Sequence, residues 1–185
     1  SEMAAHYLKE LYNIYNDLLE DNLMALRYIF KNGAPCLRKV CKPVINFDRR
    51  LHTLLDDMAE TMYHAEGAGL AASQVGVLKR VVVIDCGSGL VELVNPTIVS
   101  FSGEQKGYEG CLSFPDDRGY VVRPNRVVVR GFNRNGSAVE YEGEGLFARA
   151  VFHEVDHLNG RLFVDIATEP PEGYDDEDIK SENIS

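Results

Sequence analysis

Apolar residues recur every three to four positions in three stretches of the chain, which is the spacing of a helix with one buried face. Residues 7–23 carry the first stripe, with acidic and amide side chains opposite it. Residues 49–65 carry the second, and Asp48 before it is a suitable N-cap. Residues 144–160 carry the third, which is apolar enough to be buried. The pattern therefore predicts three helices.

Runs rich in β-branched residues lie between the second and third predicted helices, as expected of strands. The predicted strands cover residues 80–85, 91–94, 97–105, 120–122, 126–132 and 138–141, with Asn135-Gly136 as a hairpin turn. A helix, then strands, then a helix, without βαβ alternation, indicates an α+β fold with antiparallel sheets. The helix at 7–23 is predicted to be an addition to this fold.

The composition fits one globular catalytic domain. Of the 185 residues, 45% are hydrophobic and 26% are charged. No apolar run is long enough to span a bilayer, and the N-terminus lacks the basic and apolar parts of a secretory signal. The four cysteines are too few for a disulfide scaffold. We therefore expect reduced thiols, no membrane association and a cytoplasmic location.

The net charge of −10 is uneven along the chain. From residue 165 onward there are eight acidic residues and one lysine, so this end carries −7 of the total. We expect three parts: an amphipathic helical extension at 1–23, a catalytic domain at 24–165, and an acidic, mobile tail at 166–185. None of them has the basic surface that nucleic-acid binding requires.

The apolar stripe of residues 7–23 needs a partner surface. That surface is either the core of the same chain or a second copy in a homodimer. The spacing of the stripe does not choose between the two, so both arrangements stay open at this point.

The third predicted helix contains His153-Glu154-Val155-Asp156-His157. Residues four apart lie on one face of a helix, so both imidazoles can point at one metal ion with Glu154 beside them. This is the pattern of metal-dependent hydrolases, with two ligands and a general base. The alternative interpretation is two hydrogen-bonded histidines around a paired glutamate.

A catalytic site of the zinc type needs a third protein ligand. Downstream of His157 the chain has no histidine, only acidic residues. Upstream it offers Cys111 within Glu109-Gly-Cys-Leu-Ser113, and a thiolate there would complete a Cys-His-His site.

A third motif runs from Gly67 to Gly76. A dinucleotide loop is excluded there because a helix precedes it and a strand follows.

Three segments in this order resemble the peptide deformylases: Gly67-Ala-Gly-Leu-Ala-Ala-Ser-Gln74, Glu109 to Ser113, and His153 to His157. The resemblance covers about residues 24–165 and is closest to the compact bacterial type. It implies antiparallel sheets packed around a central metal-binding helix.

The resemblance also implies a role for each matching residue. Cys111, His153 and His157 would bind the metal, and Glu154 would act as general base and acid. The side-chain amide of Gln74 and the backbone N–H of Leu112 would form the oxyanion hole. The backbone at Gly69 and Gly110 would bind an extended peptide.

The implied reaction removes the formyl group from N-formylmethionyl nascent peptides and releases formate. The implied cofactor is one divalent metal ion, Fe(II) in the cell, with Zn, Ni or Co possible in a purified sample. Some members of the family end in a basic helix linked to ribosome docking. Here Glu169-Pro170-Pro171 and acidic residues stand in its place, so any ribosome contact would use another surface.

Two other functions compete with this one. The first is a metallopeptidase of the His-Glu-x-x-His class that acts on other amide bonds. The second is a metal-holding protein without catalysis that binds partners through its N-terminal helix. Loss of metal in Cys111→Ala would argue against the first, and the presence of Glu154 and Gln74 is not required by the second.

Overall fold

The computed structural model describes residues 25–174. In chain order the elements are α2 (Arg49–His64), β1 (Gly69–Ala71), β2 (Val81–Ile84), β3 (Val91–Ser102), β4 (Gln105–Cys111), β5 (Phe114–Arg123), β6 (Arg126–Phe132), β7 (Ala138–Glu144) and α3 (Leu146–Leu158). Short 3-10 turns, η1 (Pro35–Arg38), η2 (Ala72–Val75) and η3 (Phe163–Asp165), connect them. The helix expected at 7–23 and the end of the acidic tail lie outside the described residues.

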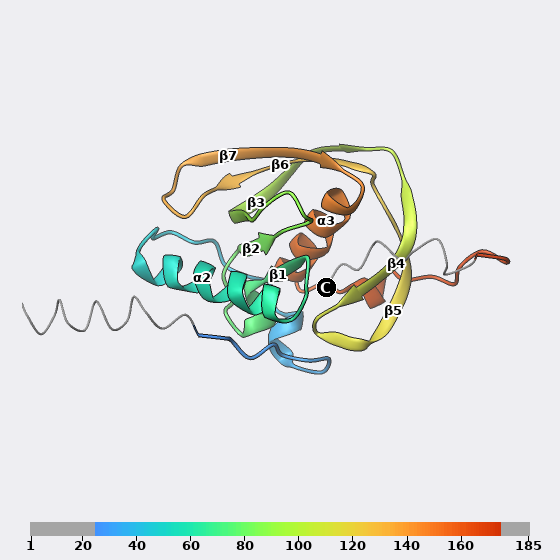
Figure 1. Cartoon of the computed structure of the whole chain (residues 1–185), viewed down its shortest axis with the longest axis horizontal. Coiled ribbons are helices and arrows are strands. Elements are labelled where there is room, and N and C mark those ends of the chain that lie inside the picture. The colour runs from blue at the N-terminus through green and yellow to red at the C-terminus, as the bar shows by residue number, and fades with distance from the viewer. Residues whose placement is uncertain (1–24, 175–185) are drawn as a thin grey trace, which may run out of the picture.

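The strands form two antiparallel sheets. Five of them pair in the order β1-β2-β3-β6-β7, and β4 pairs with β5 in a separate hairpin. The larger sheet curves over α3, and the β4-β5 hairpin runs down the far side of that helix (Figure 1). The α+β class with antiparallel sheets is therefore confirmed. None of the described helices is long and apolar enough to cross a membrane.

The strand β2 is buried on both faces, which explains its unbroken apolar sequence. On one face, Val82 and Ile84 pack in a core cluster with the buried residues of α3. On the other face, Val81 and Val83 pack against the apolar stripe of α2. The two helices therefore lie on opposite sides of one strand, and α3 is the helix enclosed by the curved sheet.

Helix α2 begins where the sequence predicts. The side chain of Asp48 accepts a hydrogen bond from the backbone N–H of Leu51 at 3.1 Å, as an N-cap does. Residues 25–30 run beside this helix (Figure 1). The N–H of Ala25 donates to Asp57, the N–H of Arg27 donates to Thr61, and the Arg27 guanidinium pairs with Asp57 at 2.8 Å.

Three strand predictions differ from the structure. The separate strands expected at 91–94 and 97–105 are one bulged strand, β3. The bulge follows Asn95, whose backbone is left-handed with φ of 53° and whose side chain bonds both backbone groups of Val44. The strand predicted at 120–122 is the end of the longer β5, and β1 and β4 have no predicted counterpart. Their glycines and polar residues give no strand pattern, since pairing rather than propensity holds them.

Candidate metal centre

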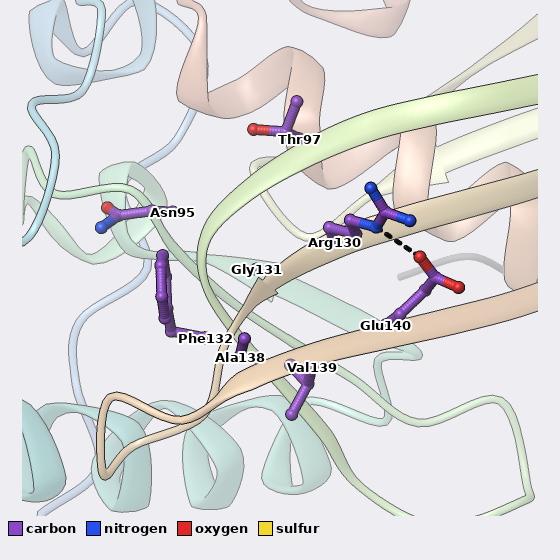
Figure 2. A pocket seen from close by; sticks show the side chains of 8 residues that line it. All are labelled: Asn95, Thr97, Arg130, Gly131, Phe132, Ala138, Val139 and Glu140. Carbon is purple, nitrogen blue, oxygen red and sulfur yellow. Dashed lines mark hydrogen bonds and ion pairs between the residues drawn. The ribbon is translucent and has the colours of Figure 1, made fainter.

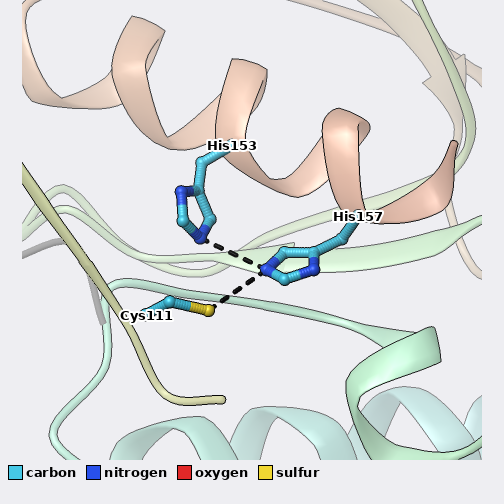
Figure 3. A group of neighbouring side chains, drawn as sticks. All are labelled: Cys111, His153 and His157. Atoms are coloured by element: carbon cyan, nitrogen blue, oxygen red, sulfur yellow. Dashed lines mark hydrogen bonds between the residues drawn. The ribbon is translucent and has the colours of Figure 1, made fainter. Parts of the chain in front are cut away.

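Cys111, His153 and His157 meet in the interior, next to α3 (Figure 3). Each offers one ligand atom, and these atoms all lie within 4.8 Å of one another. Nε2 of His157 is 3.3 Å from Sγ of Cys111 and 3.2 Å from Nε2 of His153. All three side chains are buried. The three residues named from the sequence as metal ligands therefore share one site.

Two elements position these ligands. His153 and His157 lie one turn apart on α3, so their side chains leave the same face. Cys111 is the last residue of β4, just after an irregularity in the pairing of β4 with β5 at Glu109. This irregularity at the hairpin end changes the pleat where the thiol faces the helix.

Glu109 orients His153 from the opposite side of the imidazole. Its carboxylate lies 3.0 Å from Nδ1 of His153, so Nδ1 carries the proton and Nε2 is left as the metal-facing atom. The guanidinium of Arg123 donates two hydrogen bonds to Glu109, at 2.8 and 3.0 Å. Its remaining Nη1 donates to Asp156 at 2.6 Å. The Arg123–Asp156 pair considered from the sequence thus exists, but it belongs to a buried network rather than to the surface.

Burial and charge move the pKa values of these groups in different directions. Burial raises the pKa of Glu109, but hydrogen bonds from Arg123 and His153 outweigh it and lower the pKa to about 2. Burial lowers the pKa of His153, yet its contacts with Cys111 and Glu109 give a net rise. Burial and then the neighbouring His153 lower the pKa of His157. A neutral His157 presents a lone pair, which is the form that binds a metal.

Glu154 is buried without a partner. Among the described residues, neither of its carboxylate oxygens has a hydrogen bond. Burial raises its pKa to about 7, with the charge of His153 opposing that rise and Glu109 adding to it. A Cβ at Gly69 would lie 2.4 Å from Oε1 of Glu154, so a side chain there would force the carboxylate or β1 to shift. A buried carboxylate with such a pKa can accept and return a proton near neutral pH.

Gln74 faces the centre from η2, just after β1. Its Oε1 accepts a hydrogen bond from the N–H of Ala71 at 2.9 Å, which fixes the orientation of the amide. Its Nε2 is thereby directed at Sγ of Cys111, 3.5 Å away, and at Oγ of Ser113, 3.2 Å away. The site thus holds a neutral donor beside the thiol.

The structure gathers the residues named from the sequence around one point. Leu112 and Gly110 flank Cys111 in the chain. Gly69 lies next to the carboxylate of Glu154. The side-chain amide of Gln74 contacts the thiol of Cys111. Sequence reasoning missed the contacts that Glu109, Ser113 and Arg149 make around the centre. Only Glu109 left a signal, as an acidic residue in the segment that contains the cysteine.

Arg149 lies one turn before His153 on α3 and is fully buried. Its Nη1 is 3.3 Å from Oε1 of Glu109, so two arginines share that carboxylate. A Cβ at Gly107 would lie 3.3 Å from Nη2 of Arg149, so a side chain at position 107 would crowd this guanidinium. The network therefore fixes β4 and α3 together beside the ligands.

A separate hollow of about 340 Å³ lies beside β3, β6 and β7 (Figure 2). Arg130 and Glu140 form an ion pair at its edge. Its lining contains no cysteine or histidine. We therefore assign the chemistry to the metal centre and not to this hollow.

Comparison with known proteins agrees with the geometry. The family model described as "Polypeptide deformylase" matches residues 26–172. The peptide deformylase of Acetivibrio thermocellus is 60% identical over 142 residues, which cover 77% of this chain and 84% of that protein. The peptide deformylase of Alkaliphilus metalliredigens is 56% identical over 142 residues, which cover 77% of this chain and 97% of that protein.

Solved structures show the same fold. A crystal structure of peptide deformylase from Thermotoga maritima has a TM-score of 0.76 at 43% identity and covers 78% of this chain and 99% of that chain. A Met-Ala-Ser-bound crystal structure of the class I type b peptide deformylase from Acinetobacter baumannii has a TM-score of 0.74 at 37% identity. That match covers 78% of this chain and 99% of the other.

Proposed function

This chain belongs to the peptide deformylase family, metal-dependent hydrolases that remove the formyl group from nascent polypeptides, and we propose that Cys111, His153 and His157 hold its metal ion. The single observation that carries this proposal is the buried convergence of these three ligand atoms beside the partnerless Glu154. The His-Glu-x-x-His metallopeptidase alternative is not favoured, because the family match covers most of the chain.

The donor set of one thiolate and two imidazoles fits a divalent metal ion. Bonds of about 2.0–2.3 Å to nitrogen and sulfur place the ligand atoms roughly 3.3–3.6 Å apart. The separations of 3.2 and 3.3 Å around Nε2 of His157 are close to that range, and all three ligand atoms lie within 4.8 Å of one another, so side-chain shifts would admit the ion. When bound, a divalent metal acts as a Lewis acid and lowers the pKa of a water molecule toward neutrality.

We assign proton transfer to Glu154. Its carboxylate accepts the proton of the water that attacks the formyl carbon, and it returns that proton to the leaving amine as the C–N bond breaks. The products are formate and a peptide with a free N-terminal methionine. Support comes from the buried, partnerless carboxylate and its pKa of about 7.

We assign stabilisation of the developing oxyanion to Gln74 and the backbone N–H of Leu112. Negative charge grows on the formyl oxygen as water attacks, and donors aimed there stabilise the transition state more than the substrate. The bond from Ala71 to Oε1 keeps Nε2 of Gln74 directed toward the cysteine ligand. Leu112 directly follows that ligand in the turn after β4.

We propose that the peptide binds in an extended form between Gly69 and Gly110. Within residues 25–174, β1 stands at one end of the strand order of the five-stranded sheet, next to β2. An extended peptide can add to such an edge through main-chain hydrogen bonds. The Acinetobacter baumannii structure, bound to Met-Ala-Ser, supports a peptide that begins with methionine.

For the metal itself we propose Fe(II) in the cell, with Zn, Ni or Co able to replace it in purified protein. A thiolate ligand beside two imidazoles suits each of these ions.

We also propose a cytoplasmic setting next to the translating ribosome, without docking through the C-terminal segment. All four cysteines are free thiols, which fits a reducing compartment.

Formate release from an N-formylmethionyl peptide tests the proposed function. Protein prepared without oxygen and with known metal content should release formate from this peptide and not act on the N-acetyl analogue. The acetyl group adds a methyl that the site must exclude. Equal turnover of both peptides would contradict the proposed reaction. A Cys111→Ala variant that keeps all of its metal would contradict the ligand assignment.

A further inference from the structure

A groove of about 400 Å³ lies along the N-terminal half of α2. Its lining includes the buried side chains of Leu51 and Leu54 of the helix and the half-buried Val77 from the segment before β2, which we call its apolar floor. Ile45, also in its lining, has an exposed fraction of 84%. An exposed isoleucine above an apolar floor is a surface that a partner segment would cover.

The rim of the groove is basic. Arg50 and Lys79 stand on it, together with Arg27, which pairs with Asp57. The one acidic residue in the lining is Asp48, whose side chain accepts a hydrogen bond from the N–H of Leu51 as the cap of α2. A segment with an apolar face and acidic flanks would match both the floor and the rim.

The first described residues run toward this groove. The N–H of Ala25 meets Asp57, and the N–H of Arg27 meets Thr61 one turn later, at 3.1 and 2.9 Å. Two residues of extended chain span about 6.6 Å, and four residues of helix rise about 6 Å. The segment therefore runs parallel to α2, and every two of its residues cover the length of about one helical turn.

Continuing this path backwards identifies the occupant. Two more extended residues would bring residue 23 to the turn that contains Leu54. A helix over residues 15–23, which rises about 12 Å, would then lie along the N-terminal half of α2. Residues 15–23 end the amphipathic stripe read from the sequence, with Leu19 and Leu23 on the apolar face. Asp17, Glu20 and Asp21 are the acidic residues of this stretch.

We propose that residues 15–23 dock in the groove of their own chain, with the leucines on the floor and the acids toward Arg50 and Lys79. A tether that begins at Ala25 holds this segment at a high effective concentration next to the groove, which favours it over the same segment of a second copy. The family match begins at residue 26, so the docked segment is an addition to the catalytic domain.

The same N-terminal segment is bonded to the catalytic site at its other end. The N–H of Phe30 donates to the carbonyl of Gln74 at 2.8 Å, and the N–H of Asn32 donates to the carbonyl of Ser113 at 2.9 Å. Docking of residues 15–23 would anchor the other end of this segment on α2. The inference does not depend on the catalytic assignments, and its failure would leave them unchanged.

Fluorescence can test the docking, because the chain contains no tryptophan. Leu19→Trp places a single probe on the apolar face, and Asn13→Trp places one on the opposite face of the same predicted helix. In the full chain we expect the probe at 19 to emit at shorter wavelength and to be quenched by acrylamide several-fold less than the probe at 13.

Charge exchange separates docking from a general burial of the probe. Arg50→Glu with Lys79→Glu should return the probe at 19 to the exposed state. Adding Glu20→Lys and Asp21→Lys to that variant should restore its protection. Equal quenching at 19 and 13, or charge reversal without effect, would overturn the proposal.

A second copy is the competing occupant. In that case, protection of the probe at 19 would rise with protein concentration, together with a doubled mass in light scattering. Protection that stays constant on dilution, in a particle of monomer mass, is the result that the proposal requires. Concentration dependence would overturn it.

Discussion

Glu109 links the metal ligands to the charge network around them. Its carboxylate is hydrogen-bonded to Nδ1 of His153 on one side and pairs with the guanidinium groups of Arg123 and Arg149 on the other. This position lets one carboxylate set the tautomer of a ligand and compensate two buried guanidinium groups. We therefore expect metal binding at the centre to depend on a residue outside the Cys111, His153 and His157 group.

Glu109→Gln should weaken metal binding and the fold together. Loss of a partner that orients a ligand typically reduces metal affinity about 10- to 100-fold. Leaving buried arginines without their counter-charge costs about 3–5 kcal/mol. Titration against a competing chelator and urea unfolding measure the two effects. Asp156→Asn is the control, since Asp156 bonds Arg123 but not His153, and unchanged metal affinity in Glu109→Gln would contradict the assignment.

Gly69→Ala should clash with the carboxylate of Glu154, which we propose as the group that transfers the proton. Its Cβ would lie 2.4 Å from Oε1 of Glu154, and overpacking of this kind costs about 1–3 kcal/mol. The same substitution in a Glu154→Ala background should cost less, because the clashing atoms are gone. Urea unfolding of the four proteins in this cycle gives the coupling. An equal cost in both backgrounds would show that Gly69 and Glu154 do not touch.

At the residue scale the sequence predicts what local spacing determines. His153 and His157 follow from the four-residue spacing on a helix. Cys111 is one candidate for the third ligand because no histidine lies downstream, and the family resemblance selects it. The pairing of Glu109 with Arg123 depends on the register between β4 and β5, which no local pattern specifies. Arg149 looks like one polar residue on a mostly apolar helix until the opposite hairpin is in place.

At the element scale, helices were predicted better than strands. The cap at Asp48 and the apolar stripes place α2 and α3 within one or two residues of their observed bounds. The bulge in β3 depends on Asn95 bonding Val44 across the molecule, so propensity alone splits that strand in two. The strand β1 has three residues, and its position is fixed by pairing with β2.

Asp48→Ala should destabilise α2 by about 1 kcal/mol, because the N–H of Leu51 loses its side-chain acceptor. Urea unfolding of the metal-loaded protein measures the loss. Thr53→Ala on the exposed face of the same helix is the matched control, since it removes no cap. A loss of stability that is the same in both variants would argue against the capping role.

At the scale of the whole molecule, the metal centre joins separate parts of the fold. Cys111 comes from the β4-β5 hairpin, and both histidines come from the helix enclosed by the five-stranded sheet. The sequence predicts the α+β class from the order of its elements. The order of elements alone does not predict that the sheet curves around α3, since that depends on how the paired strands twist together. Packing of the sheets around this helix is what the family resemblance implies.

Metal removal should therefore lower the stability of the whole domain. A ligand that binds only the folded state stabilises it by about 4 kcal/mol at a free concentration 1,000 times its dissociation constant. Thermal unfolding with and without chelator should show a lower Tm for the metal-free protein, restored when metal is added back. Cys111→Ser should lose most of this dependence. A Tm that chelation leaves unchanged would contradict a metal that bridges the hairpin and α3.

The central claim is that Glu154 transfers the proton at a centre held by Cys111, His153 and His157. The most direct test is formate release from an N-formylmethionyl peptide per bound metal ion, measured for the wild type and Glu154→Gln. We expect the variant to bind an equal amount of metal and to lose at least about 100-fold in turnover. A fully metallated variant that releases formate at the wild-type rate would contradict the account.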